Sequence, residues 1–111
     1  MVARKLFSRE KIVIEEVLNP QNLSNMPDNV YVKKVRTDNR KITVYIAEDY
    51  YLRIGSTLTV TVIADETPEM TTVEIISSGG KGGRFMLSWG AEKSAVNRIV
   101  EILVENGFKE L

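Results

Sequence analysis

Residues 57–64 constrain the fold most, because their side chains alternate strictly between apolar and polar. Leu58, Val60 and Val62 alternate with threonines at the odd positions 57, 59 and 61. Successive side chains of a β-strand point to opposite faces, so a period of two predicts a strand. One face of that strand is expected to be buried, and the other to be wet or shared with a partner.

Further segments of the same kind predict an antiparallel sheet of about five to six strands. In one of them Val35 falls out of phase with Val30 and Val32, which suggests a β-bulge near Lys33-Lys34. Turn residues such as Asp38-Asn39 separate the segments. The expected strands cover residues 2–7, 30–37, 42–47, 57–64, 71–77 and 84–89.

A short N-terminal helix is predicted from Arg9 to Leu18. Ser8 is a suitable N-cap, and Glu10 in the first turn complements the helix dipole. Asn19-Pro20 is expected to end this helix, because proline disfavours the helical conformation of the residue before it.

A long C-terminal helix is the clearest element. Apolar side chains recur at helical spacing over residues 95–103, which predicts a helix that packs its apolar face on the sheet. Asn106-Gly107 supplies a C-cap, and Phe108 is expected to fold back on Leu103 or Val104 in the Schellman manner. The sequence as a whole predicts a single α+β domain over residues 1–111.

The sequence contains no cysteine and no histidine. This excludes disulfide scaffolds, thiolate catalysis, sulfur-ligated zinc and nucleophile–histidine arrangements. A metal site would need oxygen ligands alone, so we expect no metal and no cofactor. Catalysis by Glu48, Asp49 or Tyr50, which follow an expected strand, ranks last among the hypotheses.

The charge of the chain is balanced, with 15 basic and 15 acidic side chains. A nucleic-acid coat protein needs a basic excess to neutralise phosphates, so nucleic acid is not an expected partner. The N-terminal residues lack the apolar core of a signal peptide, and the apolar runs are far shorter than a membrane span. We therefore expect a soluble cytoplasmic protein without a membrane partner.

Five basic side chains gather on the hairpin expected around residue 38, with Tyr31 and Tyr45 nearby. Proteins that bind single-stranded nucleic acid combine positive charge with aromatic stacking in this way. A solvated sheet edge is the favoured interpretation, because lysines at an edge deter aggregation. The cluster consists of Lys33, Lys34, Arg36, Arg40 and Lys41.

The most unusual segment is the glycine-rich run 77–84. Its glycines allow backbone N–H groups to turn towards an anion, and Lys81 and Arg84 add positive charge. The run lacks the Walker pattern, because Gly82 instead of Ser or Thr follows Lys81 and a strand is expected next. A flexible hairpin connection is the simpler interpretation. The candidate ligand-binding residues are Ser78, Gly79, Gly80, Lys81, Gly82, Gly83 and Arg84.

The order of strand, short helix, antiparallel strands and long helix resembles a shortened helix-grip fold of the START and Bet v 1 type. That resemblance implies a pocket for a small apolar or lipid-like ligand between the sheet and the C-terminal helix. A second resemblance rests on Ile75-Ile76-Ser77-Ser78-Gly79-Gly80 and Trp89-Gly90-Ala91-Glu92. These segments are similar to a small prokaryotic family without an assigned activity, although Lys81-Gly82-Gly83 departs from its simpler loop.

A threonine row on the expected outer sheet face suits self-association, in which one patch meets its own copy. The leading hypothesis is therefore a non-catalytic binding or interaction domain that forms a homodimer. The alternatives are a small apolar-ligand pocket beside the C-terminal helix, and an anion or nucleotide site at the Gly79–Gly83 loop. The residues expected on that face are Thr43, Tyr45, Thr57, Thr59, Thr61, Thr72, Ile76 and Met86.

Overall fold

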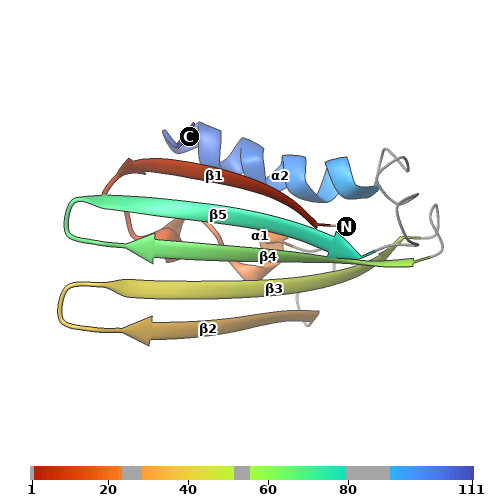
Figure 1. The fold of residues 1–111 in the computed structure, drawn as a ribbon, viewed down its shortest axis with the longest axis horizontal. Helices are drawn as coiled ribbons and strands as arrows, with labels where there is room; N and C mark the ends of the chain where they lie inside the picture. Colours follow the sequence, from red (N-terminus) through yellow and green to blue (C-terminus); the bar gives the residue numbers. More distant parts are fainter. Residues whose placement is uncertain (1, 24–28, 52–55, 80–90) are drawn as a thin grey trace.

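A computed structural model describes residues 2–23, 29–51, 56–79 and 91–111, and shows an antiparallel sheet with helices on one face (Figure 1). The predicted α+β architecture with a C-terminal helix is confirmed. The helical elements are the 3-10 turn η1 (Ile14–Glu16), the short α1 (Pro20–Leu23) and the long α2 (Ala91–Glu105). The strands are β1 (Val2–Glu10), β2 (Val30–Arg36), β3 (Lys41–Tyr51), β4 (Ser56–Glu66), β5 (Met70–Gly79) and β6 (Lys109–Glu110).

The strand order is β2-β3-β4-β5-β1-β6, so the N-terminal strand lies beside the last strand of a four-strand meander. All these pairs are antiparallel. The pairing of β2 with β3 is continuous, so the bulge expected near Lys33-Lys34 is wrong. Val35 is out of phase because it points away from the core, with 46% of its surface exposed. The strand expected at 84–89 lies outside the described residues.

The core lies between the helices and one face of the sheet. Val62 of β4 and Ile75 of β5 are buried there in one cluster with Ile99 and Leu103 of α2. Burying such a side chain contributes about 1.5–3 kcal/mol, so this layer holds the sheet and α2 together. The other buried members are Phe7, Ile14, Val17, Leu18, Leu23, Tyr45, Val60, Ala64, Val73, Val96 and Phe108.

The helix predicted over Arg9–Leu18 is not formed in that span. β1 continues through Glu10, because its last residues still pair with β5. Beyond it, Thr71 Oγ1 accepts a hydrogen bond from Ile12 N (3.0 Å) and donates one to Ile12 O (2.8 Å). These long-range bonds hold Ile12 against the sheet, and the remainder of the span forms only η1.

Asn19-Pro20 begins a helix, whereas the sequence interpretation placed a helix end there. Asn19 Oδ1 accepts a hydrogen bond from Asn22 N (3.1 Å), and Asn22 Oδ1 accepts one from Asn19 N (2.9 Å). This reciprocal arrangement has the form of a capping box. Pro20 occupies the first helical position, where a missing N–H costs nothing. The short α1 therefore brings Leu23 into the core.

The C-terminal cap agrees with the prediction. Gly107 has a φ of 87°, the left-handed conformation that glycine adopts without strain. Phe108 N donates to Leu103 O (3.0 Å) and Gly107 N donates to Val104 O (3.1 Å), which is the Schellman pattern. Phe108 is buried in the same cluster as Leu103. Within the described ranges, no helix is long and apolar enough to cross a membrane.

Candidate functional site

The glycine-rich candidate site falls largely outside the described residues. Ser78 and Gly79 form the end of β5, where Ser78 pairs with Thr59 of β4. Residues 80–84 lie outside the described ranges, so an anion site at this loop stays a prediction. Glu48, Asp49 and Tyr50 were expected to follow a strand, but they continue β3 and pair with β4. Among these three, only Glu48 has a described side chain, and it is exposed.

The basic hairpin does not form one surface. Lys33 lies on the sheet face that points away from the helices, whereas Lys34 and Lys41 lie on the helix-covered side and both pair with Glu15. Arg40 turns outward and binds Asp65 through two hydrogen bonds. Because opposite charges already engage most of these cations, the hairpin favours a structural role over a nucleic-acid groove.

The expected outer threonine row is correct in part. Thr59, Thr61 and Thr72 do lie on the face away from the helices, but Thr43 and Tyr45 lie on the buried face. The register explains the error, because Tyr45 pairs with the buried Val62. Tyr45 is held inside by a hydrogen bond from its hydroxyl to Leu18 O (3.1 Å).

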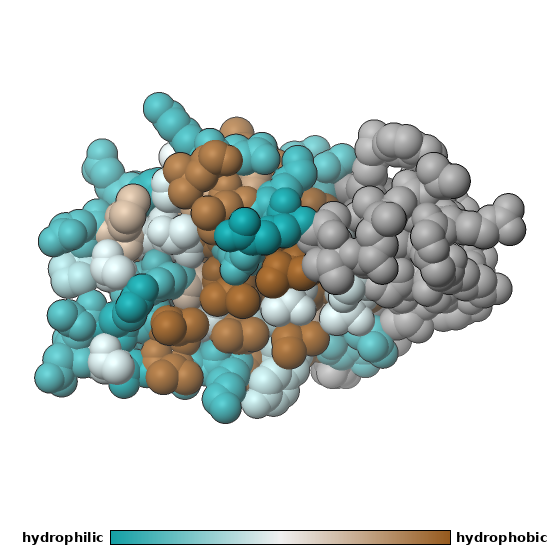
Figure 2. Space-filling view, viewed as in Figure 1, coloured by the Kyte–Doolittle hydropathy of each residue, from teal (hydrophilic) through white to brown (hydrophobic). Residues whose placement is uncertain are grey.

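The face of the sheet away from the helices, called the open face below, is the first candidate site. No described element covers it, and apolar side chains gather across its middle (Figure 2). Tyr31 is 58% exposed and Ile46 is 37% exposed, so both large side chains are open to solvent. The apolar residues of this face are Leu6, Tyr31, Val35, Ile42, Val44, Ile46, Ile63 and Ile76.

Two ion pairs lie on this face, one between the apolar side chains Ile63 and Leu6 and one at the end of β4. Arg4 of β1 pairs with Glu74 of β5, and Arg40 pairs with Asp65 at 2.6 Å. The hydrogen bonds that Arg40 donates to Asp65 hold the pKa of the Asp65 carboxyl below its usual value. The open face is therefore mostly apolar over β3 and β4, with one ion pair on β1 and β5 and another at the end of β4.

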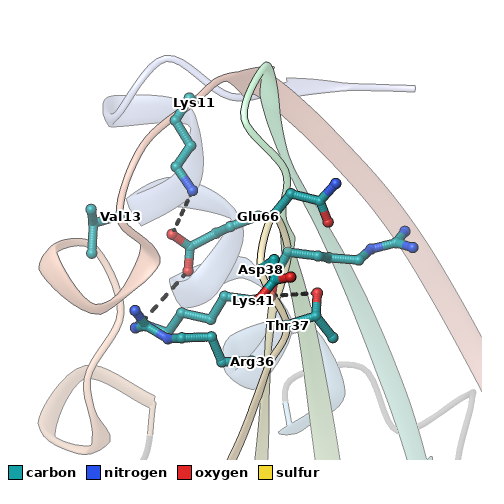
Figure 3. A pocket seen from close by; sticks show the side chains of 9 residues that line it. Lys11, Val13, Arg36, Thr37, Asp38, Lys41 and Glu66 are labelled. Atoms are coloured by element: carbon teal, nitrogen blue, oxygen red, sulfur yellow. Dashed lines mark hydrogen bonds and ion pairs between the residues drawn. The ribbon is translucent and has the colours of Figure 1, made fainter.

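A charged pocket of about 340 Å³ is the second candidate site. It lies at the end of the sheet beside the β2–β3 turn, and its lining side chains converge from three segments (Figure 3). Lys11 extends from the segment after β1 towards Glu66 at the end of β4. The lining residues are Lys11, Val13, Arg36, Thr37, Asp38, Asn39, Arg40, Lys41 and Glu66.

Glu66 is the central group of the pocket, with only 2% of its surface exposed. Its Oε1 accepts a hydrogen bond from Lys11 Nζ (3.2 Å), and Lys41 Nζ lies 3.9 Å from its Oε2. Oε2 accepts no hydrogen bond from the described residues. A carboxylate can accept several hydrogen bonds, so this buried oxygen retains unused capacity.

Glu66 was missed by the sequence interpretation, although a signal for it exists. The alternation that buries Leu58, Val60 and Val62 continues in phase to Ala64 and Glu66. An acidic side chain at an inward position near the end of a strand must find cations or a ligand, because burial of an unpaired charge is costly.

A more apolar groove of about 510 Å³ lies on the helix-covered side, between the N-terminal helical segment and strands β2 and β3. Leu18, Pro20, Val32 and Tyr45 supply its apolar walls. It is displaced from the position that the helix-grip resemblance implies, because no described side chain of α2 lines it.

Comparison with known proteins places residues 15–107 in a match to the family model described as "Family of unknown function (DUF6054)". The match spans the meander from β2 to β5 and the whole of α2. It also contains the region Ile75–Glu92, on which the resemblance to a small family without an assigned activity rests. No curated protein matches the chain.

Proposed function

The chain belongs to this family of unknown function, and from that premise we propose that it is a non-catalytic interaction domain that forms a homodimer through its open face. The observation that carries the proposal is the row Ile42, Val44 and Ile46 on β3, flanked by Ile63 on β4, on the side away from the helices. Large contiguous apolar areas on a soluble surface mark interaction sites. Such an area needs a partner with a matching apolar area and charges of opposite sign.

A second copy of the chain has that pattern. Consider a two-fold axis between β3 and β4, parallel to both strands. By the sheet register, Val44 of one copy would lie over Ile63 of the second copy, and Lys33 would lie over Glu74. The same contacts recur on the other side of the axis, which is the self-complementarity that a two-fold interface requires.

Charge favours this two-fold axis over the other possible two-fold axis in the plane of the interface, which runs across the strands. An axis that runs across the strands through Lys33 and Val44 would place Lys33 over its own copy, and like charges in contact are unfavourable. Lys33 forms no ion pair with a described residue, so it is available to Glu74 of the second copy. Glu74 would then bind both this lysine and its own Arg4.

The size of the open face also supports a dimer. Five strands of 7 to 11 residues form it. At about 4.8 Å between strands and about 3.4 Å per residue, the face covers roughly 800 Å². Stable interfaces bury about 800 Å² on each partner. Two sheets packed face to face at about −30° would therefore form a standard interface.

The oligomeric state tests the proposal. Sedimentation equilibrium and native mass spectrometry are expected to give twice the 12.5 kDa of one chain. Val44→Glu places a charge at the centre of the face and is expected to give a folded monomer. Val104→Glu is the matched control, because Val104 is 55% exposed on α2, so this variant is expected to remain a dimer. A wild-type monomer at the concentrations used, or a dimeric Val44→Glu variant, would refute the proposal.

A charge swap tests the orientation. Lys33→Glu alone is expected to weaken the dimer, because it faces Glu74 of the second copy. Adding Glu74→Lys is expected to restore much of the loss, and the double-mutant cycle isolates this pair. No recovery in the double variant would reject the axis between β3 and β4.

Binding of a small apolar ligand is a second candidate function, favoured by the groove beside η1 and α1. Val32→Trp would fill that groove from β2, and is expected to abolish the fluorescence gain of an apolar dye that binds there. Val35→Trp on the same strand points to the open face and serves as the control. Equal dye binding by both variants and the wild type would exclude the groove. The helix-grip pocket beneath α2 stays a prediction.

A further inference from the structure

The charged pocket at the β2–β3 turn lies apart from the open face. Its central group, Glu66, lies on the helix-covered side of β4, whereas Val44 and Ile63 point the other way. A dimer formed through the open face would therefore leave Glu66 on the side turned away from the second copy. The volume of the pocket, about 340 Å³, is within the range of small-molecule sites.

The cations around Glu66 fix the geometry of its carboxylate. Lys11 bonds Oε1 at 3.2 Å, while Lys41 is drawn towards Glu15 and stays 3.9 Å from Oε2. Glu15 in turn also binds Lys34 at 2.6 Å. Because Lys41 is held by Glu15, Glu66, which lines the pocket, keeps a buried Oε2 that accepts no hydrogen bond from the described residues.

The donor that Oε2 would accept is better neutral than positive. Lys11 and Lys41 already place two positive charges beside this carboxylate. A third cation would be repelled by both, whereas a hydroxyl can donate one hydrogen bond without adding charge.

The pocket also has a cation that no described acid neutralises. Arg36 extends from the end of β2 into the lining, and forms no ion pair with a described residue. Arg40 carries a second guanidinium, but Asp65 holds it on the open face. A guanidinium binds planar carboxylates and phosphates through paired hydrogen bonds. Arg36 together with Lys11 can therefore bind an anionic group.

We propose that this pocket binds a small hydroxylated anion, a molecule that carries a hydroxyl group close to a phosphate or carboxylate. The hydroxyl donates to Glu66 Oε2, and the anionic group pairs with Arg36 and Lys11. Recognition requires both groups, because Glu66 repels an anion that brings no donor. The site is independent of the proposed dimer, since none of the pocket residues supplies the apolar centre of the open face.

Three probes separate the two requirements: glycerol phosphate has both groups, inorganic phosphate has only the anion, and glycerol has only hydroxyls. Amide chemical-shift titration of the ¹⁵N-labelled full chain measures their affinities. We expect glycerol phosphate to bind about tenfold more tightly than phosphate, the gain of one charge-assisted hydrogen bond, and shifts centred on residues 36–41. Glycerol is expected to produce no saturable shift.

Matched variants identify the groups. Arg36→Ala is expected to weaken glycerol phosphate binding about tenfold, whereas Lys33→Ala, on the opposite face of the same strand, leaves it unchanged. Glu66→Gln is expected to bring the affinities for glycerol phosphate and phosphate close together, because the charge that repels phosphate is gone. Spectra of each variant without ligand verify the fold.

Three outcomes overturn the proposal. One is equal affinity of the wild type for glycerol phosphate and phosphate. Another is no binding of glycerol phosphate at concentrations on the order of 10 mM, which corresponds to a very weak site. The third is an equal loss in Lys33→Ala and Arg36→Ala, which indicates general charge attraction. None of these results bears on the dimer, whose mass is measured without ligand.

Discussion

Two buried threonines on the inner face of the sheet give a direct test of the structure, because the same substitution is expected to have opposite effects. Thr43 and Thr71 are both 0% exposed. Thr43 Oγ1 has no hydrogen-bond partner among the described residues, whereas Thr71 Oγ1 bonds both the N–H and the carbonyl of Ile12. Valine has nearly the same shape as threonine but cannot form hydrogen bonds.

Thr43→Val is expected to raise the free energy of unfolding by about 1–2 kcal/mol, because an unsatisfied buried hydroxyl is replaced by a methyl group. Thr71→Val is expected to lower it by about 2–3 kcal/mol, because two hydrogen bonds are lost and both backbone groups of Ile12 lose their partner. For a chain of this length, 1 kcal/mol corresponds to roughly 4 °C in the melting temperature.

Urea unfolding followed by circular dichroism measures both values. The Val44→Glu background is used, so that mass action from a dimer does not enter the comparison. If Thr43→Val destabilises as much as Thr71→Val, the Thr43 hydroxyl has a hydrogen-bond partner and the reasoning from an unsatisfied hydroxyl is refuted.

Two further predictions concern single side chains. Burial, with the charge of Glu66 nearby, raises the pKa of Tyr45 from its ordinary value of 10.0 to about 12. The stability that the Tyr45 hydroxyl contributes is full below its unfolded pKa and is lost as pH rises through its folded pKa. In Tyr45→Phe, the free energy of unfolding, measured by denaturation at each pH, is therefore expected to decline less between those two pKa values. Gly107→Ala is expected to lower the free energy of unfolding by about 1–2 kcal/mol, since φ is 87° and the new Cβ would lie 3.1 Å from Arg9 Nη1. Gly107→Asn should lose less in the same thermal unfolding assay, because asparagine tolerates that conformation, and equal losses would contradict a left-handed cap.

Local patterns predicted the elements whose stabilising contacts are close in sequence. The cap at Gly107 and Phe108 follows from neighbouring residues, and the strict alternation after Thr57 identifies β4. The N-terminal segment was predicted wrongly, because its conformation depends on a distant partner. The bonds from Ile12 to Thr71 cross almost sixty positions of the chain, and no local signal in residues 9–18 reveals them.

A period of two also does not decide which face of a strand points to the core. On β3, both sets of alternating residues contain apolar side chains, so Tyr45 was placed on the outer face. The pairing of Tyr45 with Val62 decides the matter, and it turns Val44 outward. The open face was therefore expected as a threonine surface, although β3 makes it apolar. Glu66 was missed for the opposite reason, since its phase was readable but its cations come from other segments.

The two proposed sites share one structural cause. Helices cover a single face of the described sheet, so β3 and β4 hold a core on one side and leave the other side exposed. At the end of the sheet near the β2–β3 turn, the helix-covered side holds Glu66 and its cations instead of apolar residues. The reason is that the helical elements do not extend over this turn. Val44→Glu alters only the open face and Arg36→Ala only the pocket. We therefore expect Val44→Glu to bind glycerol phosphate like the wild type, and Arg36→Ala to remain a dimer. Loss of both properties in either variant would show that the faces are coupled through the sheet.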